Sequence, residues 1–149
     1  MLQSIKNDLM YLLNVLESIE KIIVYAGDIS KAEAFYELND QLNFNATLNL
    51  LANIGENVGK ISDELKWKYS NIEWKTIKNF RNRVVHDYIN IDTFLVFNII
   101  KDNLPKLKSH LGDILSAEIN GGTFEIEEFN QAKTSFYYRH IDFSIIKLD

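Results

Sequence analysis

The sequence predicts an all-α protein followed by a short C-terminal segment of different character. Apolar residues recur three or four positions apart through most of the chain, which is the spacing of amphipathic helices. One proline and six glycines leave few points at which a helix must end. The last part of the chain instead alternates apolar and polar side chains. We therefore expect a helical domain over residues 1–117 and an appendage over residues 118–149.

The helical pattern divides into four long segments and a short one. The long helices are expected at residues 2–25, 44–65, 74–90 and 92–115, and the short one at residues 30–39. Pro105 lacks a backbone donor, so the last segment should kink or break near Asn103. Gly55 and Gly59 weaken the second long helix, which indicates that another helix approaches it closely there.

The C-terminal segment is expected to form strands, as a β-hairpin. Alternating stretches enriched in aromatic residues follow a turn signal and occupy residues 123–127, 135–139 and 141–145. The six acidic and three basic residues from position 118 onward give this tail a net charge of −3. It could cover a partner surface, pair with a second copy of itself, or cross over the basic stretch described below.

Composition excludes several kinds of chemistry. The chain has no cysteine, so disulfides, thiolate metal ligands and a cysteine nucleophile are all ruled out. The N-terminus has neither a basic leader nor a small-residue cleavage site, and no apolar run is long enough to span a membrane. We therefore expect a cytoplasmic protein without a signal peptide or membrane segment.

One local stretch of the chain is basic although the net charge is −5. Its cations, with no acidic residue among them, are Lys75, Lys78, Arg81 and Arg83. A local cluster of this kind can bind phosphate even in an acidic protein. The alternative is an ordinary solvated helix face.

Reactive side chains concentrate within the same stretch. His86 can accept or donate a proton near neutral pH, and Arg81 can hold a phosphate through its planar guanidinium. Asn82 precedes His86 by four residues and would lie on the same helix face. The only close histidine–carboxylate pair, His86 and Asp87, diverges on a helix, so we expect neither a metal nor another cofactor. The alternative is a helix end whose cations offset the helix dipole.

These groups could cleave RNA without a metal. Cleavage needs a base for the ribose 2′-hydroxyl, an acid for the leaving oxygen and a cation for the charge on phosphate. On one ideal helix, however, Arg81 and His86 would lie about 140° apart. Two copies facing each other across a two-fold axis would bring two such sets together, so we expect a homodimer.

The residue pattern resembles that of a known family. The run R-N-x-x-x-H-x-Y over residues 81–88 resembles the R-x4-H-x-Y signature of HEPN-domain toxins of the HepT type. The resemblance covers about residues 2–115, and the tail has no recognised counterpart. Further matches are Trp74, Ile77, F-N-A at residues 44–46, I-G-E at residues 54–56 and L-P-x-L at residues 104–107. The resemblance implies an up-and-down bundle of four to five helices that dimerises with the motifs at the interface.

The resemblance also implies an activity and its control. Such proteins are toxins of type II toxin–antitoxin systems and act as metal-independent endoribonucleases. Arg81 and His86 would be the catalytic pair here, with Asn82 supporting them. The family's partner is a minimal nucleotidyltransferase antitoxin, which would silence the toxin by transferring AMP to Tyr88. The flanking cations that would bind RNA are Lys75, Lys78 and Arg83.

A non-enzymatic function is the alternative. In it, the helical domain binds a nucleotidyltransferase and presents a substrate to it, without cleaving RNA. Among the remaining residues, His110 and His140 are expected at the surface. Trp67 and Trp74 are expected in the core or an interface, and the alternative is that an exposed tryptophan stacks on a base.

Overall fold

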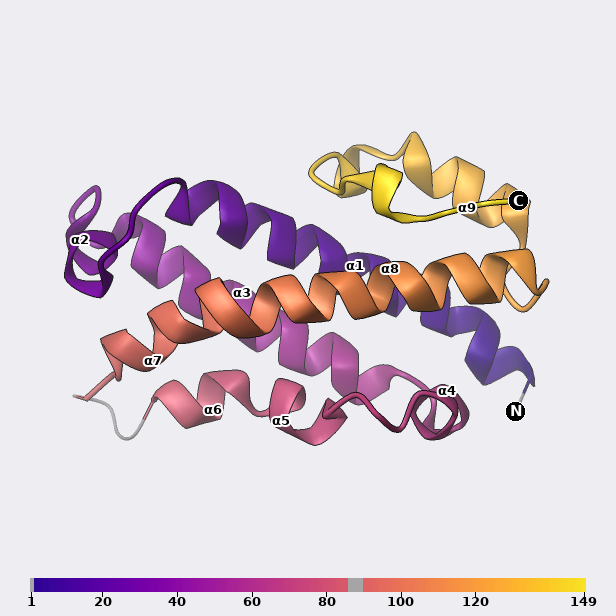
Figure 1. The fold of residues 1–149 in the computed structure, drawn as a ribbon, viewed down its shortest axis with the longest axis horizontal. Helices are drawn as coiled ribbons and strands as arrows, with labels where there is room; N and C mark the ends of the chain where they lie inside the picture. The colour runs from indigo at the N-terminus through magenta and orange to yellow at the C-terminus, as the bar shows by residue number, and fades with distance from the viewer. Residues whose placement is uncertain (1, 86–89) are drawn as a thin grey trace.

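The computed structural model describes residues 2–85 and 90–149 and confirms the all-α fold (Figure 1). The described residues contain no strand, only an isolated bridge between Val85 and Ile91. The helices are α1 (Leu2–Ala26), α2 (Ala32–Glu37), α3 (Leu42–Lys60), α4 (Asp63–Lys68), α5 (Trp74–Lys78), α6 (Phe80–Val84), α7 (Thr93–Asn98), the π-helix η1 (Ile99–Asn103), α8 (Leu104–Asn120), α9 (Ile126–Lys133), and the 3-10 helices η2 (Phe136–Tyr138) and η3 (Phe143–Ile145).

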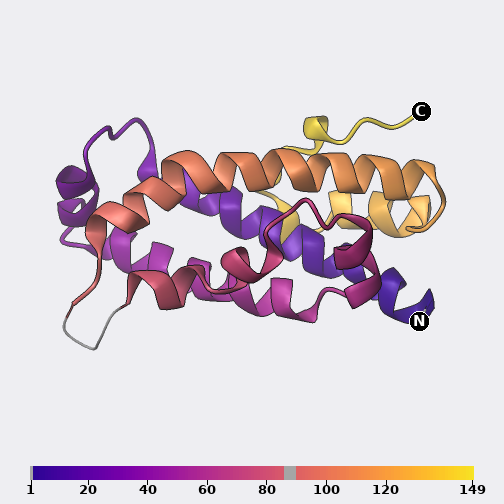
Figure 2. The same ribbon diagram turned by 60° about the horizontal axis from the view of Figure 1, so that its bottom comes forward.

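Four rows of helix run along the long axis of the molecule. These rows are α1, α3, the pair α5–α6, and the continuous α7–η1–α8 (Figures 1 and 2). Helix α1 packs against both α3 and α8, and α5 and α6 pack against α3. The apolar faces predicted from the spacing meet in one core, where α1 contributes Leu12, Leu16 and Ile19 without exposed surface. The bundle fixes α5 and α6 at its edge, with one side open to solvent.

Glycine allows α5 to approach α3 closely. A β-carbon on Gly55 would lie only 2.5 Å from the backbone oxygen of Lys78. One on Gly59 would meet the flexible end of the Lys78 side chain, 3.3 Å from Cε. The close approach expected from these two glycines is therefore confirmed.

The third long helix is shorter and more broken than expected. It divides at Asn79 into α5 and α6 and ends at Val84, whereas the spacing predicted helix to residue 90. Val85 is extended and forms the bridge to Ile91, and the Asp92 amide donates to the Val84 carbonyl at 2.8 Å. This tertiary pairing satisfies the backbone groups that a further helical turn would have used.

The irregularity expected near Asn103 takes the form of the π-helix η1. It ends two residues before Pro105, which occupies the first turn of α8. A π-helical turn holds an extra residue, so the chain can pass the proline without breaking the row. Figure 1 shows α7, η1 and α8 as one continuous helix.

The expected C-terminal β-hairpin is wrong. Residues 126–133 form α9 instead, because Ile126, Phe129 and Ala132 recur at helical spacing and Phe129 is buried. The stretches interpreted as the other strands contain single 3-10 turns. The side chains of Ser135 and Asp142 cap these turns by accepting from backbone amides two residues later.

The tail packs on α1 and α8. Figure 1 shows it on the far side of these helices from α5 and α6, so it does not cross over the basic stretch. Its buried apolar residues belong to the same core as the rest of the bundle: Ile119, Phe124, Phe129, Ile141 and Ile146. The domain boundary placed after residue 117 stays a prediction, and α8 continues across it.

Candidate functional site

The basic stretch lies on the open side of α5 and α6. Both helices bury their apolar side chains, which are Trp74, Ile77, Phe80 and Val84. This spacing turns the polar residues outward, and all the sequence-predicted site residues that the structure describes are exposed: Lys75, Lys78, Arg81, Asn82 and Arg83. The four cations and the amide of Asn82 therefore form a surface that an anionic ligand can reach.

Arg81 faces α3 at the edge of this surface. It lines a shallow hollow of about 460 Å³ together with Leu48, Asn49 and Ala52. Within residues 2–85 and 90–149, its guanidinium has no hydrogen-bond or ion-pair partner. An uncommitted guanidinium is suited to bidentate binding of a phosphate.

His86 and Tyr88, the other motif residues, lie outside the described residues. The structure does show what flanks them, because Val85 and Ile91 form an antiparallel bridge. Helix α6 ends at Val84, and the angle of about 140° expected between Arg81 and His86 falls outside the described residues. The geometry between these two residues stays untested.

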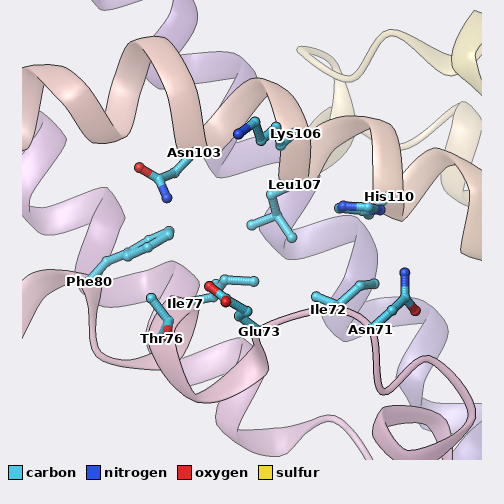
Figure 3. Close-up of a pocket in the computed structure, with 10 residues that line it drawn as sticks. All are labelled: Asn71, Ile72, Glu73, Thr76, Ile77, Phe80, Asn103, Lys106, Leu107 and His110. Carbon is cyan, nitrogen blue, oxygen red and sulfur yellow. The ribbon is translucent and has the colours of Figure 1, made fainter.

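A hollow of about 320 Å³ lies on the other flank of α5 and α6, against α8 (Figure 3). Its apolar lining is formed by Ile72, Ile77, Phe80 and Leu107. Its polar lining residues are Asn71, Glu73, Thr76, Asn103, Lys106 and His110. Sequence reasoning missed this hollow because its walls come from two segments that only the fold brings together.

The two tryptophans have opposite environments. Trp74 is only 8% exposed, and its Nε1 donates to the Tyr69 carbonyl at 3.1 Å. Trp67 is 84% exposed, so it does not belong to the core, and the interface expected as the other possibility stays a prediction. The helical spacing could not separate them, because α4 is a short helix with a single buried residue, Leu65.

A buried polar cluster fastens α4 to the end of α8. Glu118 accepts hydrogen bonds from the Tyr69 hydroxyl and from Lys68, whose Nζ lies 2.8 Å from Oε2. Burial and the neighbouring carboxylate raise the pKa of Tyr69. Burial alone would raise the pKa of Glu118, but the hydrogen bonds from Lys68 and Tyr69 lower it. The carboxylate is thus held in its charged form.

Two searches of the described residues are negative. No group of three histidine or acidic side chains gathers closely enough to hold a metal ion. No helix in the same part of the chain is long and apolar enough to cross a membrane.

Comparison with known proteins settles the family. Residues 15–114 match the family model described as Ribonuclease HepT-like. The chain belongs to the HepT-like ribonuclease family. The resemblance read from the motif is thereby confirmed, and the matched region includes Arg81, Asn82 and all of α5 and α6. The tail lies outside it.

Relatives from archaea and bacteria agree. The chain is 31% identical over 101 residues to a candidate RNase of Methanocaldococcus jannaschii, covering 68% of this chain and 90% of the relative. A candidate RNase of Caldanaerobacter subterraneus is 29% identical over 108 residues, or 72% of this chain and 94% of the relative. A candidate ribonuclease HepT of Thermococcus cleftensis is 26% identical over 98 residues, or 66% and 86%. No solved structure gives a significant match.

Proposed function

We propose that this chain is a metal-independent endoribonuclease and the toxin of a type II toxin–antitoxin system. The observation that carries the proposal is the exposed Arg81 at the open side of α6, within the family's motif, whose guanidinium has no partner among residues 2–85 and 90–149. Family membership supports RNA as the substrate. RNA of the cytoplasm is then its target.

The proposed reaction is an in-line attack within the RNA. The ribose 2′-oxygen bonds to phosphorus while the bond from phosphorus to the 5′-oxygen breaks. A base takes the proton of the 2′-hydroxyl, and an acid gives a proton to the leaving 5′-oxygen. His86 fills one of these proton-transfer roles, and Arg81 stabilises the charge on the phosphate oxygens, with Asn82 supporting them.

A homodimer would complete this site. Each chain has one histidine in the motif, whereas the reaction uses both a base and an acid. A second copy related by a two-fold axis would contribute its own His86. The surrounding cations proposed to bind the RNA strand are Lys75, Lys78 and Arg83.

The proposed control is covalent. A nucleotidyltransferase antitoxin transfers AMP from ATP to the hydroxyl oxygen of Tyr88, releasing pyrophosphate and the hydroxyl proton, and so adds a bulky anion to the cationic surface. The adduct would repel an RNA phosphate and occupy its place.

The test is RNA cleavage by the purified, unmodified chain in the presence of a chelator. We expect the native chain to cleave RNA and His86→Ala not to cleave it. The control is Lys106→Ala in α8, which lines the hollow on the other flank of α5 and should cleave RNA normally. Cleavage that requires an added metal would overturn metal independence. No cleavage by a chain of confirmed unmodified mass would overturn the enzyme and favour the non-catalytic module that binds a nucleotidyltransferase.

A further inference from the structure

The exposed Trp67 side chain is the most unusual feature outside the motif. Helix α4 is firmly placed, because Leu65 is buried and the Ser62 hydroxyl caps the helix by accepting from the Leu65 amide. The same Ser62 donates to the buried Asp8 carboxylate at 2.5 Å. Trp67 nevertheless projects from this fixed helix with 84% of its surface in solvent. A large aromatic side chain held in this way is suited to contact a ligand.

Trp67 borders a hollow of about 580 Å³ between α4 and α5. Two cations, Lys66 and Lys75, line the same hollow, along with the acidic Asp63 and Glu73. Across residues 63–83 there are six basic and three acidic residues, a net charge of +3 in a chain whose total is −5. The tryptophan therefore lies in the cationic part of an otherwise acidic molecule.

Further cations connect this hollow to Arg81 along α3. Helix α3 ends at Lys60, and α4, which carries Lys66, begins at Asp63. The Lys78 side chain lies over Gly59, and Arg81 lies beside Ala52. These two positions are about 10 Å apart along the helix axis. The phosphates of a bound RNA strand would therefore meet cations at both positions.

We propose that Trp67 is a stacking platform for an unpaired base of single-stranded RNA, at the end of a cationic path that leads from Arg81 past Lys78 and Lys66. The proposal rests on the proposed function, since it takes the substrate to be RNA. Single-stranded RNA fits because its bases are free to stack on an aromatic ring while its phosphates follow cations. Protein interfaces also use tryptophan, but they are depleted in lysine, which flanks Trp67 at both neighbouring positions.

Because the chain has two tryptophans, contact between RNA and Trp67 can be measured by tryptophan fluorescence. In the full-length His86→Ala chain, a single-stranded RNA of about 12 nucleotides should quench tryptophan fluorescence by stacking on Trp67. The matched control is Trp67→Phe in the same background, which leaves only the buried Trp74. We expect the control to lose most of the quenching.

Binding should follow the same pattern. We expect Trp67→Ala to weaken binding of labelled RNA about tenfold and Trp67→Phe to restore much of it, because phenylalanine still stacks. Lys66→Ala and Lys78→Ala should weaken binding and reduce its salt dependence. Lys106→Ala should do neither, since Lys106 lines the hollow on the opposite flank of α5.

The outcomes separate this inference from the proposed function. If the native chain cleaves RNA while Trp67→Ala binds and cleaves RNA normally, the stacking platform is overturned and the ribonuclease stands. If RNA quenches Trp67 but no chain cleaves it, the platform stands and the ribonuclease fails. If Trp67→Ala leaves RNA binding intact but changes the oligomeric mass, Trp67 belongs to a protein interface and the platform is overturned.

Discussion

The C-terminal tail and the surface of α5 and α6 differ in whether their polar groups have hydrogen-bond or ion-pair partners. In the tail, the His140 amide donates to Glu17 at 2.8 Å and the Asp142 amide donates to Glu20 at 2.7 Å. The cations of the α5–α6 surface have no such partners in the described part of the chain. Polar groups committed to one another hold the fold together, whereas uncommitted ones remain available to a ligand. Substitutions in the two regions should therefore affect different properties.

The largest expected effect is a loss of RNA cleavage when a cation of the α5–α6 surface is removed. Arg81→Ala should lower RNA cleavage by about 100-fold or more, because it removes the cation proposed to stabilise charge on the phosphate. Its thermal unfolding should match that of the native chain, since the side chain is exposed and has no partner in the part of the chain that the structure describes. Cleavage assays and calorimetry on the same preparation check both statements. A variant that cleaves at the native rate would contradict the proposed role.

The next effect is on stability, where α5 meets α3. Gly55→Ala should destabilise the fold by about 1–3 kcal/mol, because its β-carbon would clash with the backbone oxygen of Lys78. Gly59→Ala is the matched control, because only a flexible side chain faces its β-carbon. Urea unfolding of both variants is the measurement. Equal midpoints for the two variants would show that α5 is not held by this approach.

An effect on stability of similar size is expected at the tail. Glu17→Ala should cost about 1–3 kcal/mol, because the His140 amide loses its acceptor and the His140 imidazole loses a contact of 2.5 Å. Limited proteolysis should then cut the tail first, while RNA cleavage stays unchanged. The exposed Glu127→Ala in α9 is the control and should resist proteolysis like the native chain. Loss of RNA cleavage in Glu17→Ala would show that the two regions are coupled.

The smallest effect concerns pH. Because the folded state lowers the pKa of Glu118 below the usual 4.5, this carboxylate contributes stability above about pH 4.5 that is lost as the pH falls through its folded pKa. Glu118→Gln should therefore show a shallower fall in melting temperature between pH 6 and pH 3. The exposed Glu127→Gln should keep the native slope, and a native slope in Glu118→Gln would contradict the assignment.

The fold class could be predicted from the sequence because the apolar residues that recur at helical spacing are the ones that the bundle buries. The sequence also predicted the close approach at Gly55, where a β-carbon would lie 2.5 Å from the backbone oxygen of Lys78. These features are local, or require only that some neighbour exists. The family was recognised from the spacing of Arg81, Asn82 and the residues that follow.

Other features depend on contacts between distant segments and were missed. The pairing of Val85 with Ile91 ends α6 early, and no local signal announces it. Aromatic residues in the tail suggested strands, but no neighbouring strand exists among the described residues to pair with them. The exposure of Trp67 depends on how α4 sits on the bundle. The arrangement of His86 and Tyr88 remains a prediction.

The π-helix η1 keeps the buried faces of its row aligned although the row holds one extra residue. A π-turn accommodates one more residue than an α-turn, so deleting one residue from Ile99–Asn103 would favour regular α-helix. Because the widened turn absorbs the extra residue, the helices on either side would keep nearly the same rotation about the axis of the row, and Val96 and Phe97 would still face the core. Deleting one residue from the regular part of α8 would instead rotate its two sides by about 100° relative to each other. The π-turn is therefore a point at which the length of the row can change by one residue while its buried faces stay aligned.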